Sequence, residues 1–217
     1  MRRLHATGRR ERFVASGVYP AAGGLQEFWS VHEVGDGAHF IRVDRDGRGC
    51  RGHSLLQEAL RNAGGAFERV DQQLYGPGGR PVARLRCTRF QDRVELEQED
   101  EAGQRGTELS VGRDCLFLMP GILLAGMALS QATGMQQSVN VMRIAQVGDG
   151  FTWEQEILRA RCGPTARLTA PAGVGDARAC AWDGSDTQFW LDPHDVTLRL
   201  VDDGGGIELC RYARRHD

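Results

Sequence analysis

Five ionisable side chains on predicted strands are the residues of this chain best suited to acid–base chemistry. They lie in or beside aromatic runs such as "EFWSVHEV" and "FTWEQEI", and they are Glu27, His39, Arg42, Glu154 and Asp192. A carboxyl or imidazole group serves as general acid or base when its surroundings move its pKa toward the working pH. Glu154 and Glu156 would share one face of a strand, because side chains alternate along it. These residues are the catalytic candidates, and whether the chain is an enzyme stays open.

A second set of side chains is suited to holding an apolar ligand. Tryptophan offers a large amphipathic ring, and methionine adapts its shape to irregular partners. The candidate ligand-binding residues are Trp29, Met119, Leu123, Met127, Trp153 and Trp190. They predict a hydrophobic small molecule or a lipid-like compound as the partner.

Several chemistries are excluded by what the sequence lacks. All 27 basic residues are arginine, so neither a Schiff-base lysine nor a P-loop lysine exists here. No GxSxG, HExxH or GxGxxG motif is present. The six cysteines are scattered without a CxxC pair, so we expect no metal site and no cofactor. We expect these cysteines to be free thiols, mostly buried.

Charge and the first residues bear on partners and location. The net charge is −2, which gives no overall field that attracts nucleic acid, so we expect no nucleic-acid partner. The first residues are basic, but no apolar run follows them as in a secretory signal. We therefore expect a cytoplasmic protein, and we expect residues 1–10 to be flexible.

The most apolar segment is "DCLFLMPGILLAGMALSQATG", residues 114–134. Its uncharged part is shorter than the roughly 20 residues that a membrane-spanning helix needs, so we expect no integral membrane segment. Pro120 and Gly121 favour a helix that begins near them. The segment predicts an internal helix near 119–132.

The rest of the chain reads as short alternating strands separated by glycine-rich turns. An exception is "HSLLQEALRNAGG", where Ser54 and Gln57 resemble a capping box and predict a second helix near 54–63. Many short strands spaced about 8–12 residues apart indicate a large antiparallel meander or barrel. We therefore predict a mainly β (α+β) fold, in which a large curved antiparallel sheet or half-barrel encloses one or two helices. Residues 1–217 are expected to form a single domain.

Three segments also carry a family resemblance: "QLYGPGGRPVARLRC", "ELSVGRDCLFLMPGILLAGMALSQA" and the C-terminal run that begins "RLTAPAG". Together they resemble a bacterial domain family of unknown function. That family looks like the half-barrel of the lipoprotein-localisation factors and of proposed glycolipid-binding proteins. The resemblance implies a curved sheet around a helix and an apolar groove. It implies no catalytic residues. The export signal common among such proteins is not seen here, which argues against a periplasmic shuttle.

Three functions are consistent with these observations. The first is binding or carrying a hydrophobic small molecule in a cavity between the curved sheet and the helix. The second is a cofactor-independent enzyme, such as a cyclase, isomerase or hydratase, acting on a hydrophobic substrate in the same cavity. The third is an interaction module that forms a homodimer through an exposed edge strand or apolar patch.

Overall fold

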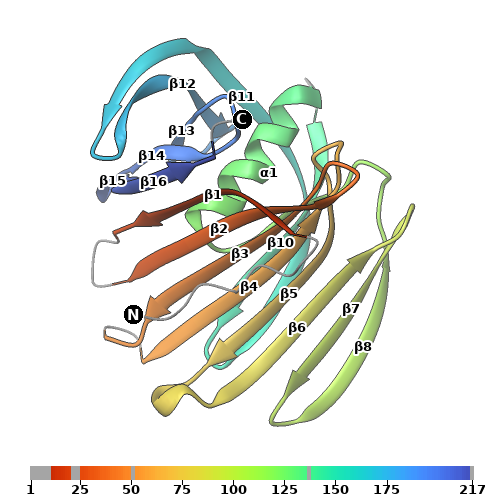
Figure 1. Ribbon diagram of the computed structural model, residues 1–217. Helices are drawn as coiled ribbons and strands as arrows, with labels where there is room; N and C mark the ends of the chain where they lie inside the picture. Colours follow the sequence, from red (N-terminus) through yellow and green to blue (C-terminus); the bar gives the residue numbers. More distant parts are fainter. Residues whose placement is uncertain (1–10, 21–24, 50–51, 136–137, 216–217) are drawn as a thin grey trace.

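The computed structural model describes residues 11–20, 25–49, 52–135 and 138–215. Residues 1–10, which the sequence predicts to be flexible, lie outside the described part. Two antiparallel sheets and one α-helix make up most of the described chain (Figure 1).

The larger sheet has nine strands in the order β16-β1-β2-β3-β4-β5-β6-β7-β8, so that it is a simple meander from β1 onward. All of its neighbouring strands are antiparallel. A short 3-10 turn, η2 (Pro77–Gly79), joins two of the strands. The strand bounds are β1 Arg12–Tyr19, β2 Gln26–Gly35, β3 Ala38–Gly47, β4 His53–Arg61, β5 Phe67–Tyr75, β6 Pro81–Arg89, β7 Arg93–Asp100, β8 Gly103–Ser110 and β16 Arg211–Arg214.

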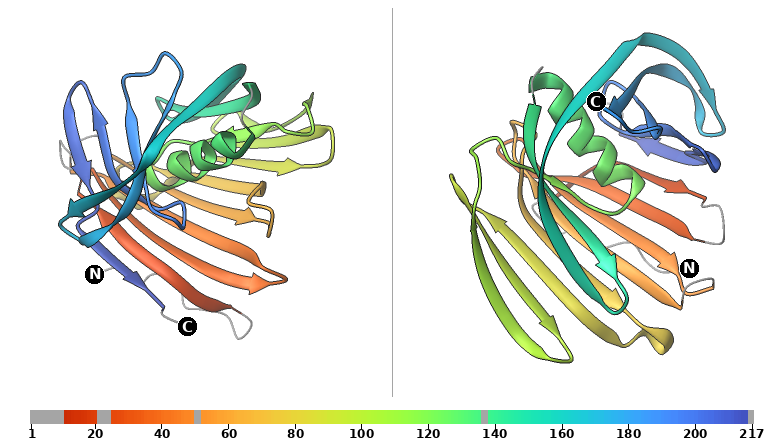
Figure 2. Two further views of the ribbon diagram at one scale, coloured as in Figure 1. Left: turned by 90° about the horizontal axis from the view of Figure 1, so that it is seen from above. Right: turned by 180° about the vertical axis from the view of Figure 1, so that it is seen from behind.

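The smaller sheet has seven strands in the order β15-β14-β13-β12-β11-β10-β9. Its neighbours are antiparallel except β9 and β10, which run parallel. The 21-residue strand β11 is long enough to pair with β10 along its first half and with β12 along its second (Figure 2). The strand bounds are β9 Leu116–Leu118, β10 Ser138–Val147, β11 Gly150–Ala170, β12 Gly173–Trp182, β13 Gln188–Leu191, β14 Thr197–Asp202 and β15 Gly205–Glu208.

Helix α1 (Ile122–Met135) lies between the two sheets, which curve around it (Figure 2). It begins directly after Pro120 and Gly121, as the sequence predicts for a helix near 119–132. Most of its side chains are buried, including Leu123 and Leu124, which are completely inaccessible to solvent. No helix in the described residues is long and apolar enough to cross a bilayer.

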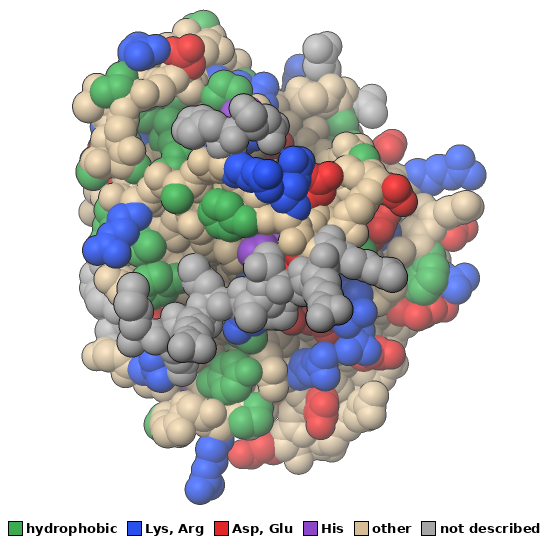
Figure 3. Space-filling view, viewed as in Figure 1, with side chains coloured by type: hydrophobic (Ala, Val, Ile, Leu, Met, Phe, Trp, Pro, Cys, Tyr) green, Lys and Arg blue, Asp and Glu red, His purple; other side chains and the backbone are tan. Residues whose placement is uncertain are grey.

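Alternation of side chains explains why these segments form strands. On β2 to β6 alternate residues point inward, and most of them are buried; Trp29, Ile41, Leu55, Val70 and Leu85 are at most 2% exposed. The residues between them point outward and are often charged, as in the ion pair of Arg86 with Glu97. Figure 3 shows basic and acidic side chains intermingled on the side formed by β6 to β8. The outer face therefore stays solvated while the inner face forms the core.

The predicted helix near 54–63 is wrong, because these residues form strand β4. Leu55, Gln57 and Ala59 are buried on the inner face, while Leu56 and Glu58 face outward. Both edges of the strand are hydrogen-bonded, to β3 and to β5. Pairing with two neighbours overrides the local helix propensity of "LLQEAL".

The fold class predicted from the sequence is confirmed: the protein is mainly β, with large curved antiparallel sheets around one helix. Neither sheet closes on itself, since β8 and β16 end the larger sheet and β9 and β15 end the smaller one. The described residues form one α-helix, so of the one or two helices expected only the later one exists.

Candidate functional site

A cleft of about 900 Å³ opens at the N-terminal end of α1. One wall is formed by the end of β3 and the start of β4 in the larger sheet. The opposite wall is formed by β10 and by the connection from β12 to β13 in the smaller sheet. The segment that leads into α1, residues 118–121, lies between them. The cleft is therefore built from parts of the chain that are far apart in sequence.

Apolar side chains from both sheets and from the helix line the cleft. Met119 comes from the turn before α1 and Ala125 from its first turn. The larger apolar residues of the walls are Leu25, Leu55, Ile144, Leu158, Trp182 and Phe189. Such a surface can hold an apolar ligand by removing it from water.

Glu27 lies behind the deep end of the cleft and caps α1. Its carboxylate accepts hydrogen bonds from the backbone N–H of Ile122 at 2.9 Å and of Leu123 at 2.9 Å. The helix itself has glycine at the preceding position and therefore no capping side chain of its own. The carboxylate thus satisfies backbone donors that the helix would otherwise leave unpaired, and it faces the positive end of the helix dipole.

Gly121 makes this arrangement possible. Its φ of +121° lies in a region that side chains other than glycine rarely adopt. A Cβ atom here would be 3.1 Å from Oε2 of Glu27 and 3.2 Å from Oε1 of Gln57. Gly121 also lines the cleft, so the polar groups of Glu27 and Gln57 lie directly behind it.

Burial raises the pKa of Glu27, although Arg45 and the two backbone N–H groups act in the opposite direction. The side chain is only 3% exposed, and Nε of Arg45 lies 3.5 Å from Oε2. Arg45 itself reaches the cleft. Glu27 is thus a structural carboxylate, because its oxygens are taken up by the start of the helix and by Arg45.

Each of the four ionisable side chains that line the cleft lies close to an ionisable group of the opposite type. His53 with Asp149 joins the two sheets, whereas each of the other three pairs lies within one sheet. The four pairs are Arg45 with Glu27 at 3.5 Å, His53 with Asp149 at 2.7 Å, Arg143 with Glu156 at 3.1 Å and Asp183 with Arg161 at 3.7 Å.

The five catalytic candidates are not brought together. Glu27 caps the helix, and Arg42 lies on the outer face of β3, where it donates to Glu58 at 3.2 Å. Glu154 is exposed on β11 and lies 3.5 Å from Arg143, which also binds Glu156. The prediction that Glu154 and Glu156 share a face agrees with this common partner.

The other two candidates lie away from the cleft. His39, on β3, is half-buried, and burial together with Arg61 lowers its pKa. Asp192 is 6% exposed and orders the turn before β14 by accepting from the backbone N–H of Val196 at 2.9 Å. Its second oxygen accepts from the Tyr212 hydroxyl at 3.0 Å, and this contact contributes to a Tyr212 pKa of about 12, which burial raises most.

The six predicted ligand-binding residues divide into three groups. Met119 lines the cleft. Trp29, Leu123 and Met127 are at most 3% exposed and belong to the packed core between sheet and helix. Trp153 and Trp190 are partly buried and pack against this core from β11 and β13.

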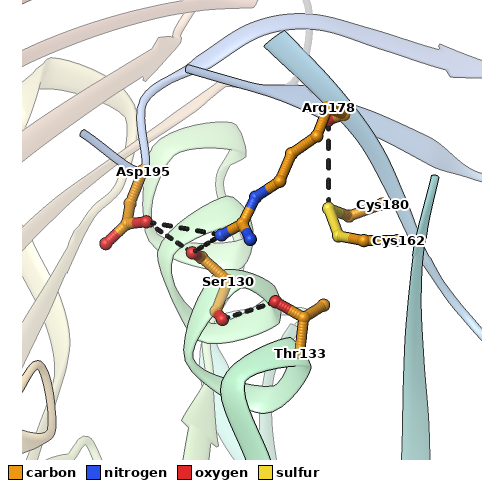
Figure 4. The surroundings of a disulfide bond; sticks show 6 residues. All are labelled: Ser130, Thr133, Cys162, Arg178, Cys180 and Asp195. Atoms are coloured by element: carbon orange, nitrogen blue, oxygen red, sulfur yellow. Dashed lines mark hydrogen bonds and ion pairs between the residues drawn. A yellow bond between two sulfur atoms is a disulfide. The ribbon is translucent and has the colours of Figure 1, made fainter. Parts of the chain in front are cut away.

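A second polar cluster lies at the other end of α1 (Figure 4). Asp195 accepts from Ser130 of the helix, and Arg178 of β12 donates to Ser130 at 2.8 Å. Arg61 of β4 also donates to Asp195, at 2.9 Å. These side chains connect the helix to both sheets. Asp195 has a φ of +66°, so its backbone takes the left-handed conformation.

Next to this cluster, Cys162 and Cys180 form a disulfide between β11 and β12 (Figure 4). The two residues are directly opposite in the strand register, with Cα atoms 4.2 Å apart. The expectation of free thiols is therefore wrong for this pair. Cys87 and Cys115 are free and buried, and burial raises the pKa of both thiols.

The sequence reasoning missed most of the residues that form the cleft. Arg45, His53 and Phe189 belong to three different strands, and their proximity depends on the strand register. One signal was available. Pro120-Gly121 at the start of an apolar helix indicates a turn where the backbone can lie close to other parts of the protein or to a ligand.

Fold and cleft together define a class of protein: a mainly β protein whose open antiparallel sheets curve around one helix and leave a cleft at the start of that helix. A solved structure with this fold is that of a beta-barrel-like protein of the domain of unknown function DUF1849 from Brucella abortus. The two share a TM-score of 0.56 and 12% sequence identity over 94% of this chain and 99% of the other. At this identity the likeness concerns the fold alone.

The neighbour agrees with the broader part of the resemblance noted in the sequence, a bacterial β-barrel-like domain of unknown function. No protein-family model matches the chain. No curated protein matches it either.

Proposed function

We propose that this protein binds a hydrophobic, lipid-like small molecule in the cleft at the start of α1. The observation that carries the proposal is the cleft itself, about 900 Å³ in volume and lined by apolar side chains from both sheets and the helix together with polar and charged ones. Ligand pockets in proteins typically measure about 300–1,000 Å³ and combine apolar walls with a few polar groups. The resemblance to half-barrel lipid carriers supports the same function.

The apolar side chains of the lining can hold an alkyl chain. Each methylene removed from water contributes about 0.8 kcal/mol, which tightens binding about four-fold. We therefore expect affinity to rise by this factor for each added carbon until the cleft is full. Dissociation constants for a series of alkyl compounds, measured by titration calorimetry, give this slope.

A variant that fills the cleft tests its location. Ala125 lines the cleft from the first turn of α1, so Ala125→Phe places a ring inside it. We expect the variant to keep the circular dichroism of the wild type and to weaken binding at least about ten-fold, since the ring displaces several ligand methylenes. Ala102→Phe, in the exposed turn between β7 and β8, is the matched control. Equal binding by both variants contradicts the proposed site.

A catalytic function is not favoured by the geometry. Of the five acid–base candidates, Glu27 lies behind the cleft lining, and its oxygens already accept from the helix backbone. Glu154 lies beside the lining residue Arg143 and is exposed. A general base needs a free lone pair within hydrogen-bond reach of the substrate. Binding without chemical change is therefore the function that we carry forward.

A further inference from the structure

The disulfide between β11 and β12 lies next to one wall of the cleft. Trp182, the last residue of β12, lines the cleft together with the connection that follows it, residues 183–185. Phe189 of β13 lines it too. Cys180 lies two residues before Trp182 and directly opposite Phe189 in the register of β12 and β13. The covalent link to Cys162 is therefore attached to the same short piece of sheet that forms this wall.

A short ladder connects this wall to β11. Among the described residues, β11 pairs with β10 as far as Arg159 and with β12 from the next residue onward. Three consecutive pairs follow before the register shifts between Cys162 and Thr165. Pro164 lies inside the shift and has no N–H to donate to the ladder. The three pairs are Ala160 with Trp182, Arg161 with Ala181 and Cys162 with Cys180. The disulfide thus closes the end of this ladder that lies next to the irregularity.

On the other side of the disulfide, β12 is attached to the helix. Arg178 lies two residues before Cys180 and donates to Ser130 of α1 at 2.8 Å (Figure 4). Arg178 is opposite Thr165, beyond the register shift. The disulfide therefore lies between the residue that binds β12 to the helix and the residues of β12 that form the cleft wall. A cross-link at this point restricts how far the wall can move away from the helix.

The two sulfur atoms differ in how easily a second thiol can reach them. Cys162 is exposed on β11, whereas Cys180 is 1% exposed. A thiolate from outside the protein therefore reaches the disulfide at Sγ of Cys162. The bond between the sulfurs breaks, and Cys180 leaves as a thiolate that takes up a proton. The second thiol of a dithiol then displaces Cys162, so that the dithiol gives up two electrons and becomes a disulfide itself.

We infer that the disulfide between Cys162 and Cys180 is a redox-sensitive brace of the cleft, and that its reduction by a dithiol weakens ligand binding. This inference rests on the proposed function, because it concerns the regulation of the same cleft. Reduction leaves the three pairs to hold the wall to β11 without a covalent link. A wall that keeps its binding arrangement for about one fifth of the time weakens binding about five-fold, which is the loss that we expect.

Titration calorimetry with 1-decanol on the full chain, before and after treatment with dithiothreitol, tests the brace. Alkylation by iodoacetamide followed by mass spectrometry shows whether the disulfide has been reduced. We expect the reduced protein to bind decanol about five-fold more weakly than the oxidised protein. Equal affinity of the two forms overturns the brace and leaves the proposed function standing, and so does a disulfide that dithiothreitol does not reduce in the folded protein. Failure of the oxidised protein to bind decanol overturns the proposed function.

Two variants separate the disulfide from the other cysteines. Cys162→Ala/Cys180→Ala should bind decanol as weakly as the reduced wild type and should not respond to dithiothreitol. Alanine is used because a serine hydroxyl at the buried position 180 would add a polar group to the core. Cys210→Ala is the matched control, because Cys210 is a free cysteine, and this variant should respond to dithiothreitol as the wild type does. A response of the double variant to dithiothreitol contradicts the assignment.

Hydrogen exchange tests the brace without any ligand. Reduction should speed the exchange of backbone amides in residues 160–162 and 180–182, while the amides of β2 to β5 keep their protection. Unchanged exchange in both segments overturns the brace even if decanol does not bind. Loss of protection throughout the chain, together with loss of the circular dichroism signal, shows that the disulfide holds the whole fold and overturns a local role at the cleft.

Discussion

Removing the carboxylate of Glu27 should be one of the most damaging single changes in this fold. Glu27→Ala leaves the backbone N–H groups of Ile122 and Leu123 without their acceptor at the start of a buried helix. It also removes the partner of Arg45. An unsatisfied buried donor costs about 1–3 kcal/mol, and breaking a buried ion pair costs about 3–5 kcal/mol. Both effects arise from the same carboxylate and are not additive, so we expect the free energy of unfolding to fall by about 3–5 kcal/mol in total.

Glu27→Gln separates the capping role from the charge. The amide keeps one oxygen as an acceptor for the helix, so we expect a smaller loss of about 1–2 kcal/mol at pH 7. Urea unfolding followed by circular dichroism and tryptophan fluorescence measures both variants. Glu33→Ala is the control on the same strand, because Glu33 forms a surface pair with Arg12. The capping argument is refuted if Glu27→Ala costs no more than Glu33→Ala.

The pH dependence of the same pair of proteins gives a second test. Burial raises the pKa of Glu27 in the folded state above its value in the unfolded chain, about 4.3 for glutamate. The folded state then holds the proton more tightly, so the resulting stability is fully present below about pH 4.3 and is lost as the pH rises through the raised pKa. The free energy of unfolding of the wild type minus that of Glu27→Gln should therefore fall as the pH rises through the raised pKa of Glu27. A difference that rises with pH contradicts the direction of the shift.

Three further substitutions test how the helix is held. At Gly126 a Cβ would overlap Oγ1 of Thr197 and lie 3.1 Å from Leu191, so we expect Gly126→Ala to cost about 1–3 kcal/mol in urea unfolding. The double variant with Thr197→Ala should recover part of this loss of stability. If the losses of the two single variants simply add, the overlap is not the cause. Asp195→Ala removes a partner of Ser130 and Arg61 and should cost about 1–3 kcal/mol, against nearly nothing for the exposed Asp176→Ala. Replacing Cys162 and Cys180 by serine opens an 18-residue separation and should lower stability by about 3 kcal/mol, with no further effect of a reductant on the variant.

The sequence predicted the fold class well because the alternation of apolar and polar residues is local information. The hairpin around Gly35-Asp36-Gly37 is an example: two alternating runs flank residues that take positive φ in the structure. The internal helix could also be predicted, because a short apolar run that follows Pro120-Gly121 indicates a buried helix that begins there. The segment around Leu55 and Gln57 failed because its helix propensity is local, whereas its two strand partners are not.

The candidate site was harder to predict for the same physical reason. Trp29 and Met127 are residue types that often line ligand sites, but in this fold they are buried in the core between the sheet and the helix. Glu27 was chosen as a polar group that points inward, and it does. Its partner is the start of a helix 95 residues later, a contact that no spacing rule predicts.

The pairing of β16 with β1 has a consequence for the order in which the molecule is made. β1 hydrogen-bonds to β2 on one side and to the last strand of the chain on the other, with Ala15 opposite Arg214. During synthesis β1 to β8 can assemble early as neighbouring hairpins, but the outer edge of β1 stays open until β16 leaves the ribosome. An open strand edge is a template for pairing with other chains. The edge of β1 is therefore open to pairing with other chains in the interval before β16 emerges.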